Sequence, residues 1–328
     1  MNDQYELTII ISNYNQEKYL HETVDSVLSQ EVSFPFKVII TDDYSCLDRS
    51  KDIIRDYAEK HKNIEPIFAN ENGGYLTNIL RAITKTDYIC FLDADDYWTD
   101  SNFLQRAYDF LECHGEYSIY EANVNVISEE GNRNHPYISP KRKSGSYSKE
   151  MYLQYKNVPI TQTTGMFLRN CIFANGIPDI MKNAVGTRSE RSFEGDTGRF
   201  IMHLKHGLAY YDSSIVGVYR KTNNGIWTSL SEAKKKIITA RFYQDYYQYY
   251  RTNLDFFVNK AYRALQRYLE EKQNELSELG SHSEFIDEYE KLMFDDVYCF
   301  CKENEKEIIR DKTTLKDKIK QIYSVLKS

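Results

Sequence analysis

The stretch that decides the fold is Tyr88-Ile89-Cys90-Phe91-Leu92, an apolar run that leads directly into Asp93-Ala94-Asp95-Asp96. The apolar run is typical of a buried strand, and three carboxylates follow where that strand would end. In extended chain the side chains of Asp93 and Asp95 point to the same side, so both can reach one ion. An isolated Asp-x-Asp is more often a solvated acidic turn, because short motifs recur by chance. The surrounding sequence must therefore decide between an ion site and a turn.

Strand-like and helix-like segments alternate through the first hundred residues. Apolar runs at 7–11, 36–40 and 64–69 each precede a segment whose apolar residues recur at helical spacing, at 20–28, 53–58 and 76–83. Strands joined by single helices predict an α/β fold with a doubly wound, mostly parallel, Rossmann-like sheet. Ligands of such sheets bind beyond the carboxyl ends of the strands.

Polar residues stand at the carboxyl ends of all four predicted strands. They are Ser12-Asn13-Tyr14-Asn15, Thr41-Asp42-Asp43-Tyr44-Ser45, Asn70-Glu71-Asn72-Gly73-Gly74 and Asp93-Ala94-Asp95-Asp96. The ring of Tyr14 can stack on a base, Asp42 or Asp43 can accept from a base or ribose, and Gly73 permits close backbone approach. Each group alone also fits a turn or a helix cap. Together, at one rim of the sheet, they predict nucleotide binding.

Composition limits the class of protein. The 328 residues carry a formal net charge of -7 with a pI near 5.6, which argues against a general nucleic-acid binder. The six cysteines form no Cys-x-x-Cys pair, and we expect reduced thiols in a cytoplasmic protein. Neither a secretory leader nor an apolar run long enough to cross a membrane is expected from the sequence.

A series of short motifs follows in order between Leu7 and about Thr228. They are Ile11-Ser12-Asn13-Tyr14-Asn15, Thr41-Asp42-Asp43-Tyr44-Ser45, Asn72-Gly73 with Asn78, Phe91-Leu92-Asp93-Ala94-Asp95-Asp96, Thr163-Thr164-Gly165-Met166-Phe167, Gly195-Asp196 and Val218-Tyr219-Arg220. In this order the chain resembles the family-2 glycosyltransferases, which are inverting enzymes with the GT-A fold. The ordered set is much more specific than any one motif.

The resemblance implies a donor pocket and a metal site. In the family, the residues matching Ser12, Tyr14, Asp42 and Asp93 hold a nucleoside diphosphate, and the one matching Asp95 ligates Mn²⁺ or Mg²⁺. The whole predicted nucleotide-sugar pocket comprises Ser12, Tyr14, Asn15, Asp42, Asp43, Asn72, Gly73, Asn78, Asp93, Ala94, Arg220 and Trp227, with Asp95 and Asp93 as metal ligands. Ser12 stands where a proline is common, and Thr222 lies near the place of a frequent histidine. The second departure leaves a third protein ligand of the metal open.

The resemblance also implies a catalytic base. Asp196 follows Gly195 at the start of a predicted helix, where a carboxylate is by default a cap. By the resemblance, Asp196 removes the proton of the acceptor hydroxyl in one displacement that inverts the sugar, while the metal neutralises the departing diphosphate. Glu194 is the other candidate base and is expected to orient or hold the acceptor.

Two loops carry two interpretations each. The polar, proline-broken stretch at 132–145 fits a mobile flap near the acceptor or a solvated loop. In relatives, the segment after Val218 folds over the diphosphate. Arg220 therefore fits a phosphate contact or a brace of the fold, and Trp227 fits closure of the pocket or stacking on a sugar.

We expect a catalytic domain over 1–228, with a nucleotide-binding half at 1–100 and an acceptor half at 101–228, followed by a helical appendage over 229–328. The last hundred residues contain no proline and little glycine. Near the end, Leu315, Ile319, Ile322 and Leu326 form one apolar face among lysines. That pattern fits a helix packed on its own domain or on a second copy in a homodimer, or one lying on the inner face of the cell membrane.

The predicted activity is transfer of a sugar from a nucleoside-diphosphate sugar, with UDP expected, to a hydroxyl of a glycan or lipid-linked acceptor in bacterial surface-polysaccharide synthesis. Two alternatives stay open. One is a non-catalytic nucleotide-sugar-binding or assembly subunit. The other is a sugar nucleotidyltransferase, which should carry a glycine- and arginine-rich loop where this chain has Ser12-Asn13-Tyr14-Asn15-Gln16.

Overall fold

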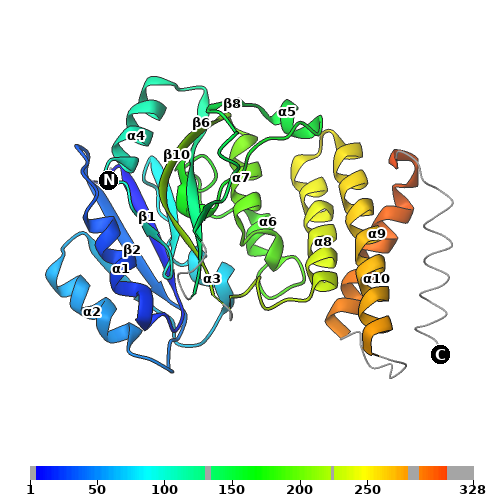
Figure 1. Cartoon of the computed structure of the whole chain (residues 1–328), viewed down its shortest axis with the longest axis horizontal. Coiled ribbons are helices and arrows are strands. Elements are labelled where there is room, and N and C mark those ends of the chain that lie inside the picture. The colour runs from blue at the N-terminus through cyan, green and yellow to red at the C-terminus, as the bar shows by residue number, and fades with distance from the viewer. Residues whose placement is uncertain (1–4, 130–133, 223–224, 280–287, 309–328) are drawn as a thin grey trace. The chain divides into compact units, whose positions relative to one another are not determined.

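The computed structural model describes residues 5–129, 134–222, 225–279 and 288–308 (Figure 1). The chain divides into two compact units. The α/β unit comprises residues 1–185 and 193–222, and the helical unit comprises residues 186–192 and 223–328. The division after 222 lies close to the boundary expected at 228. The transfer of 186–192 to the helical unit has no counterpart in the sequence pattern.

The first half of the central sheet is parallel. Its strands are β1 (Leu7–Asn13), β2 (Phe36–Asp42), β3 (Ile64–Phe68) and β4 (Tyr88–Asp93), in the spatial order β3-β2-β1-β4. The register pairs Asn13 with Asp42 and Ser12 with Asp93, so the polar ends of these strands meet at one edge. These four strands confirm the predicted parallel sheet and the rim at its carboxyl edge.

The second half of the sheet mixes directions. Its strands are β5 (Tyr97–Trp98), β6 (Tyr117–Ser128), β7 (His135–Pro136), β8 (Gly145–Tyr147), β9 (Met166–Arg169) and β10 (Leu208–Lys221). Strand β9 runs antiparallel to both β4 and β6, and β6 and β10 are parallel. The predicted α/β fold is confirmed, and its sheet is mixed, with a parallel first half and with β9 as the antiparallel link between the halves.

Helices cover both faces of the sheet (Figure 1). They are α1 (Glu17–Leu28), α2 (Ser50–Lys60), α3 (Gly74–Leu80), α4 (Phe103–Cys113), α5 (Lys149–Leu153), α6 (Asp179–Lys182) and α7 (Asp196–Leu204), with a 3-10 turn, η1, at Thr163–Gly165. Leu7, Ile9 and Ile11 pack in one core with residues of α1, α2 and α4. Alternate residues of a strand point to opposite faces, which is why the central strand β1 is apolar on both sides.

The 132–145 stretch contributes to the sheet at two points. Within its described part, β7 pairs with β6 and β8 pairs with β10. Asn123 donates to the Ile138 carbonyl at 2.8 Å and accepts from the Ile138 amide at 2.9 Å. The stretch from His135 to Tyr147 is therefore attached to the sheet at both of its ends.

The helical unit has its own core. Its helices are α8 (Glu232–Tyr250), α9 (Leu254–Leu279) and α10 (Glu288–Glu303), with short 3-10 turns η2 (Glu190–Ser192) and η3 (Glu305–Glu307). Apolar residues of all three helices pack together, among them Ile237, Leu265, Tyr268, Phe294 and Val297. Helices are what a proline-free, glycine-poor region predicts.

Segment 186–192 is held to these helices by a polar network. Asp245 on α8 accepts from the hydroxyls of Ser189 and Ser192, at 3.0 and 2.7 Å. Arg188 and Arg241 both pair with Asp296 on α10 at 2.8 Å. The chain therefore leaves the α/β unit after α6, is fixed among α8 and α10, and returns before α7.

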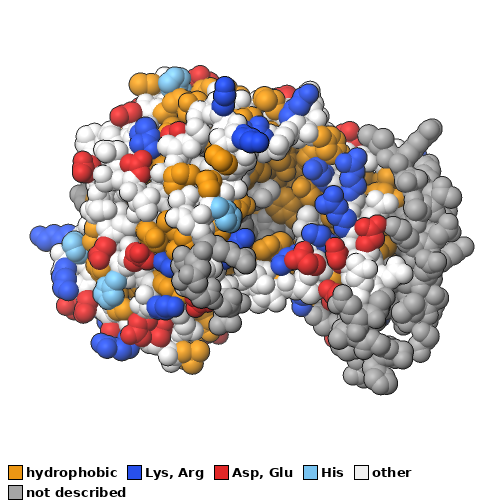
Figure 2. All heavy atoms as spheres, in the orientation of Figure 1, with side chains coloured by type: hydrophobic (Ala, Val, Ile, Leu, Met, Phe, Trp, Pro, Cys, Tyr) orange, Lys and Arg blue, Asp and Glu red, His pale blue; other side chains and the backbone are white. Residues whose placement is uncertain are grey.

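The apolar face expected at Leu315, Ile319, Ile322 and Leu326 lies outside the described residues. None of the helices that the structure describes combines the length and the apolar character needed to cross a membrane. On the face of the α/β unit seen in Figure 2, acidic and basic side chains are interspersed.

Candidate active site

The three acids after β4 have different surroundings. Asp93 and Asp95 are partly exposed, whereas Asp96 is buried. Asp96 accepts a hydrogen bond from the Arg220 amide at 2.8 Å and another from the Thr164 hydroxyl. Asp96 thus anchors the turn to β10 and η1, which leaves Asp93 and Asp95 as the pair that can face a ligand.

Burial and nearby acids raise the pKa values of Asp93 and Asp95 and so disfavour their ionised forms. Burial and the nearby Asp93 raise the pKa of Asp95 to about 7. Burial also raises the pKa of Asp93, although Arg199 and the Tyr75 hydroxyl oppose the rise. Two adjacent carboxylates whose ionisation is penalised are a fitting place for a divalent cation, because its charge would favour their ionised form.

The residues present fit a metal held partly by its substrate. Among the described side chains, no cluster of three or more His, Cys, Asp or Glu has the arrangement of a metal site. Mg²⁺ in phosphate-binding sites is commonly held by one or two carboxylates, with phosphate oxygens and water completing its shell. Asp93 and Asp95 are the residues that would supply those carboxylates.

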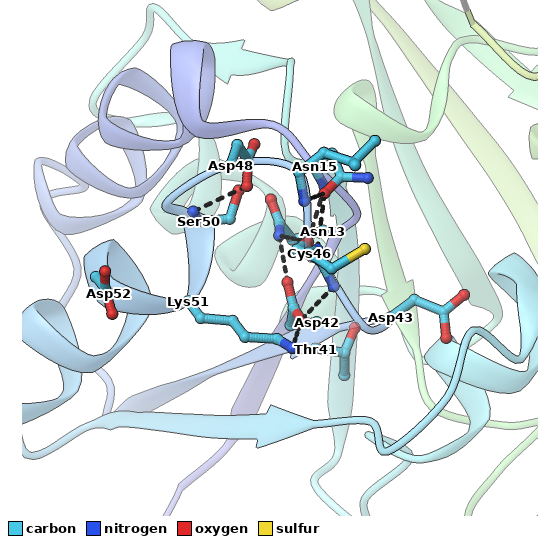
Figure 3. A network of polar contacts seen from close by, with 12 residues as sticks. Asn13, Asn15, Thr41, Asp42, Asp43, Cys46, Asp48, Ser50, Lys51 and Asp52 are labelled. Carbon is cyan, nitrogen blue, oxygen red and sulfur yellow. Dashed lines mark hydrogen bonds and ion pairs between the residues drawn. The ribbon is translucent and has the colours of Figure 1, made fainter.

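Asp42 lies at the centre of a polar network between the loops after β1 and β2 (Figure 3). It is fully buried, and it accepts from the Asn13 side chain at 2.7 Å and from the Ser45 amide at 2.9 Å. Lys51 Nζ lies 3.9 Å from Oδ1, the carboxylate oxygen that accepts from Ser45. These contacts fix the loops after β1 and β2 relative to each other.

Asn15, in the loop after β1, also ties that loop to the loop after β2. Its side-chain oxygen accepts from the amides of Cys46 and Leu47, at 3.1 and 3.2 Å, and its backbone has a positive φ of 52°. Asparagine tolerates this left-handed conformation better than most residues. Between these fixed points the ring of Tyr14 is 46% exposed, which leaves it accessible to a base.

Asp43 organises the glycine turn that precedes α3. Its two oxygens accept from the amides of Gly73 and Gly74, both at 2.9 Å, and Arg81 lies 3.2 Å from Oδ1. Figure 3 shows Asp43 pointing away from the network around Asp42. Gly74 has a φ of 82°, a conformation that glycine adopts without strain.

The remaining rim residues lie on neighbouring elements. The Asn72 side-chain oxygen accepts from the Gly74 amide at 3.3 Å. Asn78 on α3 donates to the Ser12 hydroxyl at 3.2 Å and to the Thr41 carbonyl at 3.3 Å. The Ala94 amide donates to the Ser12 carbonyl at 3.2 Å. The structure thus gathers the rim residues of β1, β2, α3 and β4 at one edge of the sheet.

Arg220 has the geometry of a brace. Its Nε donates to the Asp95 carbonyl at 3.0 Å, its guanidinium pairs with Glu22 at 2.6 Å, and it lies over the Tyr19 ring at 4.4 Å. Trp227 belongs to the helical unit, where it is 47% exposed. The ligand contacts expected of these two residues stay predictions.

Asp196 is the first residue of α7, but it does not cap that helix. The N-cap is Gly195, and Asp196 instead accepts from both the amide and the hydroxyl of Thr163 in η1, the former at 2.8 Å. Glu194 lies two residues earlier and is partly exposed. The capping explanation for Asp196 is therefore wrong for this helix, and its role as a base stays a prediction.

Several residues at this site were missed from the sequence. Tyr44 is 43% exposed beside the same rim, with Lys51 over its ring at 4.7 Å. Tyr75 donates to Asp93 at 2.6 Å, and Arg199 contacts Tyr75 and Thr163. The one available signal was the spacing of Asp196 and Arg199, three apart at a helix start and thus on one face.

Comparison with known proteins agrees with this geometry. The family model "Glycosyl transferase family 2" matches residues 8–175. TuaG of Bacillus subtilis, provisionally named a teichuronic acid biosynthesis glycosyltransferase, is 27% identical over 237 residues, which cover 70% of this chain and 84% of TuaG. An uncharacterised protein of Mycobacterium tuberculosis is 25% identical over 72% of this chain, and the match spans only 64% of that protein's length.

Solved structures show the same fold. The crystal structure of Staphylococcus aureus TarS 1-349 in complex with UDP-GlcNAc superposes with a TM-score of 0.51 and 19% identity, covering 92% of each chain. A complex of the same protein with UDP gives a TM-score of 0.50 at 18% identity over 92% and 91% of the two chains. The fold and the family model together establish that this chain belongs to glycosyl transferase family 2.

Proposed function

We propose that the chain transfers a sugar from a nucleoside-diphosphate sugar to a hydroxyl group of a glycan or lipid-linked glycan. The observation that carries the proposal is that two acidic residues from different elements lie close together. Asp93 ends β4, Asp196 begins α7, and they lie near enough for Asp196 to contribute to the raised pKa of Asp93, after burial as the main cause. Family membership supports this interpretation of the pair.

The donor would occupy the rim at the carboxyl ends of β1, β2 and β4. The exposed Tyr14 ring offers a surface for the base, and the amides of the Gly73-Gly74 turn are already ordered by Asp43. UDP-sugars are the donors to test first, because TarS, which shares the fold, forms complexes with UDP and UDP-GlcNAc.

Asp93 and Asp95 would hold Mn²⁺ or Mg²⁺. When bound, such an ion neutralises charge on the departing diphosphate. The chain's own part is to hold the two carboxylates at the end of a buried strand, with Asp96 and Arg220 fixing the turn that carries them. This arrangement keeps the acids in place before donor and metal arrive.

Asp196, at the start of α7, would act as the base that takes the proton from the acceptor hydroxyl. Both hydrogen bonds from Thr163 reach its Oδ1, and Oδ2 has no hydrogen bond from the described residues. The Oδ2 atom is therefore the one that can accept the proton of an acceptor hydroxyl. A single attack on the anomeric carbon, with the diphosphate leaving from the other side, would invert its configuration.

The acceptor is proposed from the relatives' names. TuaG is named for teichuronic acid biosynthesis, and a poly(ribitol-phosphate) beta-glucosyltransferase of Bacillus spizizenii is 35% identical over 32% of this chain and 17% of its own length. We therefore propose a cell-surface polymer or its lipid-linked precursor as acceptor. A cytoplasmic location, contact with the inner membrane face and pairing of two copies through the last helices stay predictions.

Binding and turnover measured on the same protein test the proposal. Titration calorimetry with UDP-, GDP- and dTDP-sugars, with and without Mn²⁺, should show metal-strengthened binding of one nucleotide class. Release of free nucleoside diphosphate, dependent on added acceptor glycan, should then identify transfer. Tight binding of a donor with no release for any acceptor would favour the non-catalytic subunit, and absence of binding throughout would reject the proposal.

A further inference from the structure

Arg199 lies at the centre of the proposed site without facing solvent. It stands one turn into α7 and is 7% exposed. Its guanidinium lies over the ring of Phe91 at 4.6 Å and over the ring of Tyr75 at 5.6 Å. Aromatic faces favour a cation, so the group is both fixed and stabilised between β4 and α3.

Both ends of the guanidinium donate to hydroxyl groups. Nη1 donates to the Thr163 hydroxyl at 2.6 Å, and Nη2 donates to the Tyr75 hydroxyl at 3.0 Å. Each of these hydroxyls in turn donates to a carboxylate, Thr163 to Asp196 and Tyr75 to Asp93. One continuous chain of hydrogen bonds therefore runs from Asp93 through Arg199 to Asp196.

On both sides of Arg199 the hydrogen bonds point outward, from the guanidinium toward a carboxylate. The cation donates outward on each side, and each hydroxyl passes its own proton toward a carboxylate. Hydrogen bonds arranged in this way polarise one another and strengthen in a buried setting. Burial opposes the charge on Arg199, but Tyr75, Asp93 and Asp196 outweigh it and raise the pKa of the guanidinium.

We propose that Arg199 is a positioning residue that couples the donor-side acid Asp93 to the acceptor-side acid Asp196. The inference rests on the proposed sugar transfer. In-line attack needs the base and the leaving group at a fixed separation, and small misplacements of such groups slow a reaction severely. The planar fork of arginine can reach two hydroxyls at once, which the single ammonium of lysine cannot reproduce in the same geometry.

A merely structural role for Arg199 makes a different prediction. A brace of the core would affect stability, and the losses caused by cutting its two hydrogen bonds would be independent of each other. If Arg199 couples the two acids, the loss caused by cutting one hydrogen bond depends on whether the other is still present. Once either hydroxyl is removed, the guanidinium loses its fixed position, so removal of the other hydroxyl costs little more.

The test is a double-mutant cycle on turnover with Tyr75→Phe and Thr163→Val. We expect each single variant to lower kcat about tenfold and the double variant to lower it by little more than either alone. The dissociation constant for the nucleotide, measured by calorimetry, should change less than about threefold in all three. Thr163→Ser, which keeps the hydroxyl, should retain kcat within about threefold.

Two further results bear on the inference. Losses that multiply to about a hundredfold in the double variant would overturn it, as would full activity of Thr163→Val. Arg199→Lys should lower kcat by about tenfold, as the double variant does, with the nucleotide still bound. The wild-type protein is assayed first, so turnover by the wild type with multiplicative losses in the variants rejects the coupling and leaves the sugar transfer standing.

Discussion

Thr163 donates both its backbone amide and its side-chain hydroxyl to one oxygen of Asp196, from a position 33 residues earlier in the chain. The acid at the start of α7 is thus oriented by the 3-10 turn η1 and not by its own helix. This orientation leaves the second carboxylate oxygen without a hydrogen bond from the described residues, and it makes a substitution at Asp196 informative.

Asp196→Asn should lower kcat about 100-fold to 10,000-fold, because the amide keeps an oxygen for Thr163 but cannot accept a proton. Nucleotide affinity should stay within about twofold, since the proposed role of Asp196 concerns the acceptor and not the nucleotide. The measurement pairs steady-state turnover with calorimetric binding of the nucleotide. Glu194→Gln is the matched control, and it should raise the KM for the acceptor more than it lowers kcat. Wild-type turnover in Asp196→Asn would remove this residue from the mechanism.

Asp95→Asn should abolish most of the strengthening that Mn²⁺ gives to nucleotide binding, by about tenfold or more, because one of the two proposed carboxylate ligands is lost. Calorimetric titrations with and without the metal give this ratio directly. Asp52→Asn is the control, since Asp52 is an exposed acid on α2 whose side chain pairs only locally with Arg55. An unchanged metal effect in Asp95→Asn would move the ion away from this turn.

Asp43→Asn should weaken nucleotide binding and lower the free energy of unfolding by about 1 to 3 kcal/mol. The reason is that an amide can no longer accept two backbone hydrogen bonds and a contact from Arg81 as a charged carboxylate does. Urea unfolding and nucleotide titration measure the two effects. Binding as strong as in the wild type would show that the Gly73-Gly74 turn does not touch the donor.

Glu121 on β6 predicts a pH dependence of stability. It is fully buried, its Oε2 accepts from the Thr161 amide at 2.9 Å, and burial raises its pKa to about 8. The unfolded chain releases this proton near its ordinary pKa, whereas the folded chain keeps it. Stability should therefore fall by about 1.4 kcal/mol per pH unit between about pH 5 and 8.

Glu121→Gln isolates this contribution, because the amide resembles the protonated acid and does not titrate. Urea unfolding from pH 5 to 8 should show a shallower decline in the variant than in the wild type. Parallel declines in the two proteins would mean that Glu121 is ionised in the folded chain.

Asp245→Ala should lower the free energy of unfolding of the helical unit by about 3 kcal/mol, because Arg241 would lose a buried partner and two serine hydroxyls their acceptor. Limited proteolysis should then cut within segment 186–192 before any other described loop. Lys182→Ala is the control, since its pair with Asp179 is exposed. An uncut segment in the variant would show that other contacts hold it.

The parallel half of the fold could be predicted because its signals are local. Each of β1 to β4 is an apolar run with polar residues at its end, and the intervening helices repeat their apolar residues at helical spacing. The short antiparallel strand β9 could not be placed, since four residues carry little periodicity and its neighbours lie far away in sequence. Its position follows only from the packing of the whole sheet.

The residues of the candidate site also fall into those that local motifs predict and those that only the fold brings together. Asp93, Asp95 and Asp196 stand in recognisable motifs, and the structure places them at the ends of the expected elements. Tyr75, Thr163 and Arg199 act through one another across three elements, and no single stretch of sequence contains that relationship. Asp42 and Asp43 occur side by side, yet their directions differ because one holds the loop after β1 and the other the glycine turn.

Segment 186–192 has a consequence for how the chain is made. Its partners Arg241, Asp245 and Asp296 are synthesised at least about 50 residues later, so on a ribosome the segment emerges before these three partners exist. The contacts of this segment with Asp245 can form only once α8 has been translated, and its contact with Asp296 only once α10 has been translated. A chain that stops before α8 would therefore leave segment 186–192 without any of these contacts.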